Sequence, residues 1–138
     1  MKKINRIKSI SAAAVLSLAV AAPASALVLT ADYTDASVAG GIYQTATGQL
    51  QSGPGGGATD VTATFKANVA AAFTYLQNSI QVAWNHVVTF KLATLVGADG
   101  DSLITSEDVN LRPDASTIRF DNSAVRHFFV DPTPFDNS

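Results

Sequence analysis

The sequence predicts an α+β protein in which one long amphipathic helix packs on a small sheet, after a cleaved signal peptide. Three observations lead to this fold class. Residues 59–84 carry apolar side chains at helical spacing, residues 87–96 form a β-prone run directly after them, and residues 1–26 have the make-up of an export signal. A long helix followed closely by a strand is typical of a helix-on-sheet layer, and 138 residues suffice for one such domain.

Residues 1–26 read as a secretory signal peptide. An apolar run over residues 10–20, too short to span a membrane, is followed by the small-residue cleavage site Ala24-Ser25-Ala26. The run is preceded by four basic residues, Lys2, Lys3, Arg6 and Lys8. We therefore expect a protein that is secreted, periplasmic or held at the cell surface.

Charge and cysteine content exclude several classes of function. After cleavage the chain keeps five basic against eleven acidic residues, a formal net charge of −6. An acidic protein with few charged residues binds nucleic acids and anionic membranes poorly. We therefore expect no nucleic-acid partner and no membrane partner after cleavage. The chain has no cysteine, which excludes thiol catalysis and disulfide bonds.

The exported chain divides into two parts by composition. Residues 27–58 are rich in Gly, Ala and Thr and end in the Gly53-Pro54-Gly55-Gly56-Gly57 run, so we expect a flexible, irregular segment. Its first residues, 27–30, are β-prone and form either a sheet-edge strand or a loose terminus. Residues 59–138 are expected to form a small α+β domain that is either complete or lacks a covering layer.

The helix predicted over residues 59–84 has a clear start and one apolar face. Thr59 or Asp60 offers a side-chain oxygen to its first free N–H groups. Lys66 and Gln77 on its other faces indicate a core helix and not a membrane helix. The apolar stripe consists of Val61, Phe65, Val69, Phe73, Leu76, Ile80 and Trp84.

Two strands and an apolar end follow the helix. Residues 87–96 alternate apolar and polar side chains and stop at Gly97, and residues 116–120 form a second, shorter strand. Residues 128–130, Phe-Phe-Val, are apolar enough to require burial. The Asp131-Pro132-Thr133-Pro134 sequence then prevents both a helix and a central strand.

An acidic loop over residues 97–109 resembles the calcium loops of EF-hands and dockerin repeats. If Ile104 takes the apolar eighth position, then Asp99, Asp101 and Asp108 fall on positions three, five and twelve. Gly97 and Ser102 depart from the pattern, because an aspartate and a glycine are expected there. The candidate ion is calcium, and the alternative is a polar turn followed by a single helical turn.

No complete catalytic motif is present. His86 and His127 belong to no H-E-x-x-H pair, no G-x-S-x-G occurs, and no base stands beside a serine in the sequence. We expect His86 at the end of the helix, His127 at the surface and Trp84 in the core. The sequence leaves open whether the protein is an enzyme.

The order of these pieces resembles the N-terminal part of exported bacterial zincin-like metalloproteases. An alanine-rich helix is followed by a Val-Thr-Phe-Lys-Leu strand, a polar loop and an apolar run closed by D-P-T-P-x-D-x-S over residues 131–138. The resemblance covers residues 60–138. It implies an opening helix packed on a twisted sheet, with the zinc helix and its H-E-x-x-H motif later in the chain.

The catalytic H-E-x-x-H region of that family is absent from this sequence, so the resemblance assigns no zinc ligand to any residue here. It implies a protease-like segment that is inactive alone, with zinc only in a full-length relative and a missing C-terminal half as partner. Two alternatives stay open. One is a secreted binding module that uses the degenerate calcium loop, and the other is a structural cell-surface protein that self-associates through strand edges.

Overall fold

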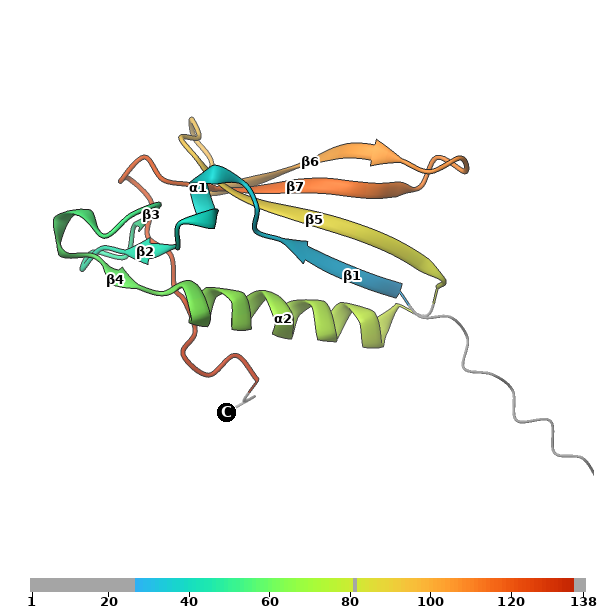
Figure 1. Ribbon diagram of the computed structural model, residues 1–138, viewed down its shortest axis with the longest axis horizontal. Helices are drawn as coiled ribbons and strands as arrows, with labels where there is room; N and C mark the ends of the chain where they lie inside the picture. The colour runs from blue at the N-terminus through green and yellow to red at the C-terminus, as the bar shows by residue number, and fades with distance from the viewer. Residues whose placement is uncertain (1–26, 81, 136–138) are drawn as a thin grey trace, which may run out of the picture.

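The computed structural model describes residues 27–80 and 82–135, and these residues form one long helix with two sheets (Figure 1). The predicted α+β content is therefore confirmed. The elements in chain order are β1 (Leu27–Asp32), α1 (Ala36–Ala39), β2 (Tyr43–Gln44), β3 (Leu50–Gln51), the 3₁₀ turn η1 (Gly55–Gly57), β4 (Thr59–Asp60), α2 (Thr62–Ser79), β5 (Trp84–Ala93), β6 (Gly100–Glu107) and β7 (Pro113–Asp121). The predicted signal peptide lies outside the described residues.

The larger sheet has the strand order β1-β5-β7-β6. β1 and β5 run parallel and are linked through α2, and β5 and β7 also run parallel. β6 is the antiparallel edge strand on the far side of β7. The strands expected at residues 27–30 and 116–120 are present within β1 and β7, and the strand expected at 87–96 overlaps β5, which begins earlier and ends at Ala93.

Residues 27–58 are not the flexible segment that their composition predicted. They contribute β1 to the main sheet, and Tyr43 pairs with both Gln51 and Asp60 in the small sheet β3-β2-β4. Val38, Ile42 and Leu50 are buried in the core. These three apolar side chains pack in the same core cluster as Phe65 and Phe90.

The helix is shorter than the periodicity predicted. α2 ends at Ser79, because Ile80 already has extended backbone angles, and Trp84 begins β5. Trp84 fits the helical stripe by spacing, but it also starts the alternation of inward-facing residues that continues through His86 and Val88. The N-cap residue is Val61 and makes no side-chain capping bond, so the predicted cap at Thr59 or Asp60 is displaced by one residue; Asp60 instead accepts the Thr62 N–H from β4.

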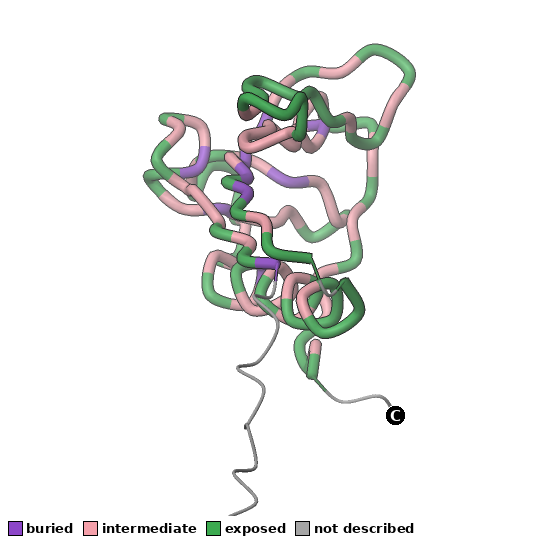
Figure 2. The backbone as a smooth tube through the Cα atoms, turned by 90° about the vertical axis from the view of Figure 1, so that its right-hand side faces the viewer, coloured by how far each residue is buried: buried purple, intermediate pink, exposed green. Residues whose placement is uncertain are grey.

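The core lies between α2 and one face of the main sheet. Phe65 packs edge-on against Phe90 of β5 and Phe120 of β7, with ring centroids 6.2 Å and 5.3 Å away. Phe73 approaches Phe90 at 6.1 Å. Buried positions are short stretches in Figure 2, separated by half-buried and exposed backbone. The apolar interior of the described residues is therefore thin.

The C-terminal segment returns along the helix. The Phe128 N–H donates to the Gly48 carbonyl at 2.9 Å, and Asp131 is hydrogen-bonded to Asn68 of α2. Phe128 packs on the core as its apolar run predicted, whereas Phe129 and Phe135 are exposed. Within residues 27–80 and 82–135, no helix is long and apolar enough to cross a membrane.

Candidate functional site

The candidate site lies on the face of the main sheet against which α2 packs. It is the part of that face, over β7 and β6, that α2 does not cover. Residues directly opposite each other on neighbouring strands point to the same face, so Ile118 and Ser102 share the face of Phe90. Ser116 and Ile104 likewise share the face of Val88. Ile104 remains 53% exposed, which shows that α2 leaves the β6 side of this face open.

One end of this surface is an apolar hollow of about 360 Å³ between α2, the sheet and the C-terminal segment. Its polar side chain, Asn68, already bonds the Thr64 carbonyl and the backbone of Asp131. The hollow is lined by Leu50, Phe65, Asn68, Val69, Ala72, Phe73, Leu76, Phe90, Ile118, Phe120, Phe128, Phe129 and Val130. This end offers apolar contact and no free polar anchor.

The other end is a hollow of about 550 Å³ that contains a histidine and two serines. It shares Ile118 with the apolar hollow, so the two adjoin. Its lining consists of Trp84, His86, Ser102, Leu103, Ile104, Pro113, Ser116 and Ile118. It has no charged residue in its lining, and its polar chemistry comes from His86 and the hydroxyl groups.

His86 connects two strands through both ring nitrogens. Nδ1 lies 2.8 Å from the Pro113 carbonyl oxygen, and Nε2 lies 2.8 Å from Ser116 Oγ. A carbonyl oxygen only accepts, so Nδ1 carries the proton, and Nε2 of the neutral ring accepts from the Ser116 hydroxyl. The side chain is 9% exposed, and this arrangement fixes the ring in one tautomer.

Trp84 stands beside His86, with ring centroids 5.1 Å apart. Its indole N–H is buried and has no hydrogen-bond partner among the described residues. An unsatisfied buried donor costs free energy of about 1–3 kcal/mol. This unpaired donor is therefore closed to solvent and is a local cost to the stability of the fold.

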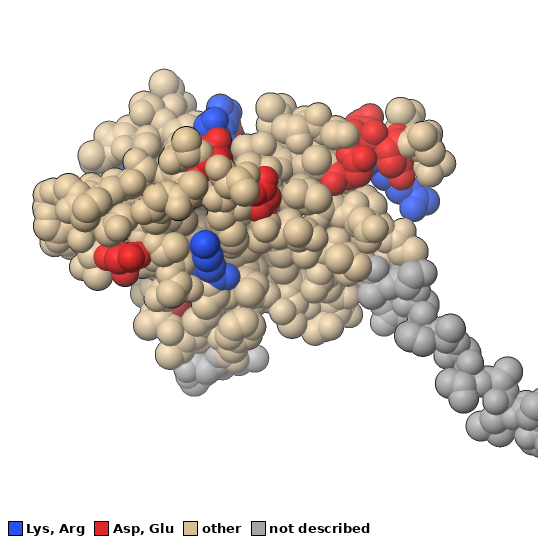
Figure 3. Space-filling model, in the orientation of Figure 1, with Lys and Arg blue, Asp and Glu red and all other residues tan. Residues whose placement is uncertain are grey.

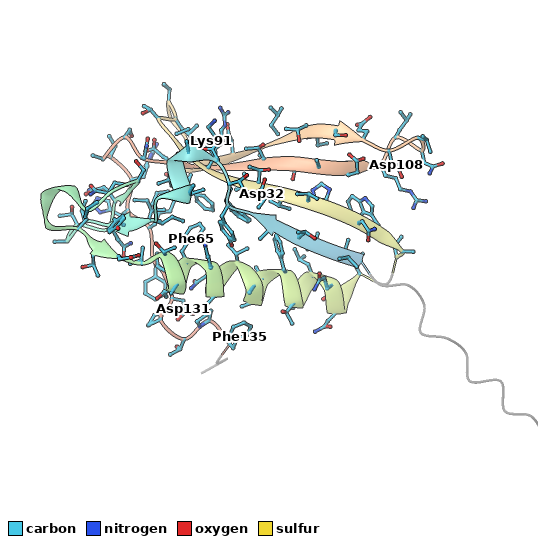
Figure 4. The ribbon with its side chains drawn as sticks, in the orientation of Figure 1. Asp32, Phe65, Lys91, Asp108, Asp131 and Phe135 are labelled. Carbon is cyan, nitrogen blue, oxygen red and sulfur yellow. The ribbon has the colours of Figure 1, made fainter. Side chains whose placement is uncertain are left out.

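The structure does not bring the three candidate calcium ligands together. The predicted loop is mostly the strand β6, in which Asp101 pairs with Arg119 near one end, and Asp108 lies beyond the other end. Figure 4 shows Asp108 at the far end of the sheet from Lys91, the neighbour of Arg119. Seven residues of extended chain separate Asp101 from Asp108 by roughly 20 Å, whereas calcium ligands lie about 2.3–2.6 Å from the ion.

Each of the three carboxylates has a structural partner instead. Asp99 Oδ1 lies 3.0 Å from Arg126 Nε. Asp101 forms a two-pronged pair with the Arg119 guanidinium, which lowers the pKa of the Asp101 carboxyl. Asp108 accepts the Arg112 and Asn110 N–H groups in the β6–β7 turn, and these bonds lower its pKa. The three carboxylates are therefore paired separately and do not converge on one another.

Charged groups are sparse elsewhere too. Most of the face in Figure 3 is uncharged, and Asp and Glu gather at the right-hand end near β6 and β7. Within the described part of the chain, no group of three or more His, Asp or Glu side chains is placed to hold a metal ion. His127 is exposed as expected, and its Nδ1 contacts the Thr47 carbonyl.

The pairing of His86 with Ser116 was missed by sequence reasoning. The two residues are 30 positions apart, and His86 was expected at a helix end. The parallel register places Val88 opposite Ser116, so His86 is only two residues along the same face. The sequence shows a histidine and a serine at inward-facing positions of two β-prone runs. Only the register between the two strands shows that these side chains lie next to each other.

No family model, no curated protein and no solved structure matches this chain.

Proposed function

We propose that this chain is an exported protein equivalent to the non-catalytic front segment of a secreted zinc metalloprotease, and that it does not hydrolyse peptides alone. One observation carries the proposal. The helix α2 occupies only part of its sheet face and leaves an apolar strip over β7 and β6 uncovered, in which Ile104 is 53% exposed.

The uncovered strip is about as wide as one α-helix. Neighbouring strands lie about 4.8 Å apart, so β7 and β6 together span roughly 10 Å. A helix with its side chains is about 10–12 Å wide. One further helix laid beside α2 would therefore fill the strip and bury Ile118 and Ile104 against the sheet.

The resemblance to zincin-like proteases supplies a candidate for that helix. In those proteases the opening helix packs on a twisted sheet, and the zinc helix follows later. A segment after β7 that returned to the same face would cover the strip, as helices cover sheets in layered domains. On this proposal the zinc ligands belong to that later helix, and the described residues supply its supporting layer.

Zinc-dependent proteolysis by purified residues 27–138 tests the proposal. We expect no cleavage of a casein or peptide library with or without added zinc, and no change in the melting temperature on adding zinc. Cleavage that is lost on chelation and restored by zinc would contradict the proposal, because it would place a working metal site in this segment.

A structural cell-surface role is the second candidate, and the edge strand β6 favours it. Only β7 pairs with β6 among the described residues, and Leu103 and Ile104 of β6 are more than half exposed. Such an edge can pair with another chain. Size-exclusion chromatography at two protein concentrations separates the roles, since edge pairing predicts a larger species at the higher concentration.

A further inference from the structure

We propose that Ser116 is a nucleophile, activated by His86, for acyl transfer from small neutral esters with apolar groups. This activity goes beyond the proposed function and belongs to the chain without a covering helix, because such a helix would fill the same hollow. The proposal stands on two observations: the hydrogen-bond chain through His86 and the hollow that His86 and Ser116 line.

The hydrogen-bond chain has the order that nucleophilic catalysis requires. The Pro113 carbonyl orients the imidazole through Nδ1–H, and Nε2 faces Ser116 Oγ at 2.8 Å. An activated hydroxyl needs a base within about 2.6–3.2 Å, and that base needs a third group to fix its orientation. Here a backbone carbonyl takes the place that a carboxylate fills in a Ser-His-Asp triad.

The hollow defines the class of substrate. Ser116 and His86 lie on its wall together with Trp84, Ile104 and Ile118, and none of its lining residues is charged. A charged substrate would have no partner there and would lose its hydration. A neutral ester with a short aliphatic or aromatic group fits both the volume of about 550 Å³ and the apolar walls.

The chemical step balances without a cofactor. Ser116 Oγ attacks the ester carbonyl carbon while its proton passes to His86 Nε2. The tetrahedral intermediate then expels the alcohol, which takes that proton and leaves an acyl-Ser116 ester. Water, activated by the same Nε2, hydrolyses this ester to a carboxylic acid and restores the serine.

The test uses the full chain, a fluorescent fluorophosphonate and p-nitrophenyl butyrate. We expect the phosphonate on Ser116, located by mass spectrometry, and hydrolysis of the ester by the wild-type chain. Ser116→Ala and His86→Gln should each lower the rate by about 100-fold or more. Ser79→Ala, which removes an exposed serine of α2, should leave both readouts unchanged.

Two results would overturn the proposal. The first is a folded wild-type chain, verified by circular dichroism, that takes no phosphonate on Ser116. The second is hydrolysis by Ser116→Ala at the wild-type rate. If His86→Gln does not fold, phosphonate labelling of the wild-type chain and the rate of Ser116→Ala still decide the question.

Discussion

Asn68 of α2 makes two hydrogen bonds with the backbone of Asp131. Its Nδ2 donates to the Asp131 carbonyl at 2.7 Å, and its Oδ1 accepts the Asp131 N–H at 3.1 Å. Figure 4 shows Asp131 and Phe135 on the segment that runs beneath α2. The Asn68 side chain thus pairs with the Asp131 backbone as a neighbouring strand would. This pairing holds the C-terminal segment over the apolar hollow.

Replacing Asn68 with alanine should loosen this segment. Asn68→Ala leaves the N–H and carbonyl of Asp131 without their partner, so we expect a loss in unfolding free energy of about 1–3 kcal/mol. Urea denaturation measures the loss, and cleavage by a protease near residues 128–135 should become faster. The control Asn78→Ala, at an exposed site on the same helix, should change stability by no more than about 0.5 kcal/mol. Equal effects of the two variants would show that the Asp131 contact contributes nothing.

Phe65 should be the most sensitive position on α2. It is 7% exposed and touches both Phe90 and Phe120, so Phe65→Ala removes a ring from the centre of the core. We expect a loss of about 3–5 kcal/mol in unfolding free energy. Tyr75 is 72% exposed on the same helix, and Tyr75→Ala should cost less than about 0.5 kcal/mol. A small loss in Phe65→Ala would contradict the helix-on-sheet core.

Asp121 should make stability depend on pH in the acid range. Its carboxylate is 2% exposed, and hydrogen bonds from the Ser123 hydroxyl and the Leu95 N–H lower its pKa. A lowered folded-state pKa gives stabilisation that is present above the unfolded value of about 3.9 and is lost as pH falls through the folded-state value. The advantage of wild type over Asp121→Asn in urea midpoint should therefore be largest near pH 6 and decrease below about pH 4. A constant difference across that range would exclude Asp121 as the titrating group.

Calcium should have no effect on stability. Asp99, Asp101 and Asp108 each have another partner, and Asp108 lies at the far end of β6. The melting temperature should stay the same on adding about 5 mM calcium, which exceeds the usual dissociation constants of extracellular calcium modules. A rise that disappears in Asp101→Ala would restore the calcium loop.

The sequence predicted the structure correctly where a residue pattern was compatible with only one type of secondary structure. The alternation in residues 87–96 predicted β5, because Val88, Phe90 and Leu92 all face the core. The first three turns of the apolar stripe on α2 were also predicted correctly, since helical spacing and burial agree at Phe65 and Val69. Trp84 satisfied the helical and the strand pattern equally, so periodicity alone did not place it.

Other features depended on contacts between distant residues. Ile42 and Leu50 are fully buried although they lie among glycines and threonines, because β2 pairs with β3 on one side and with β4 on the other. Asp101 was assigned to a loop from the spacing of the acidic residues alone. That spacing contains no information about Arg119, its partner on the neighbouring strand, which lies 18 positions away. The His86–Ser116 pair required the parallel register of β5 and β7, which no local pattern contains.

The most direct test of the proposed function is to sequence the gene through and past the codon for Ser138. The account predicts that the downstream sequence encodes an amphipathic helix with an H-E-x-x-H motif, which would cover the strip over β7 and β6. A stop codon with no such motif in any downstream frame would contradict the protease-like origin. The self-association of β6 would then become the leading account.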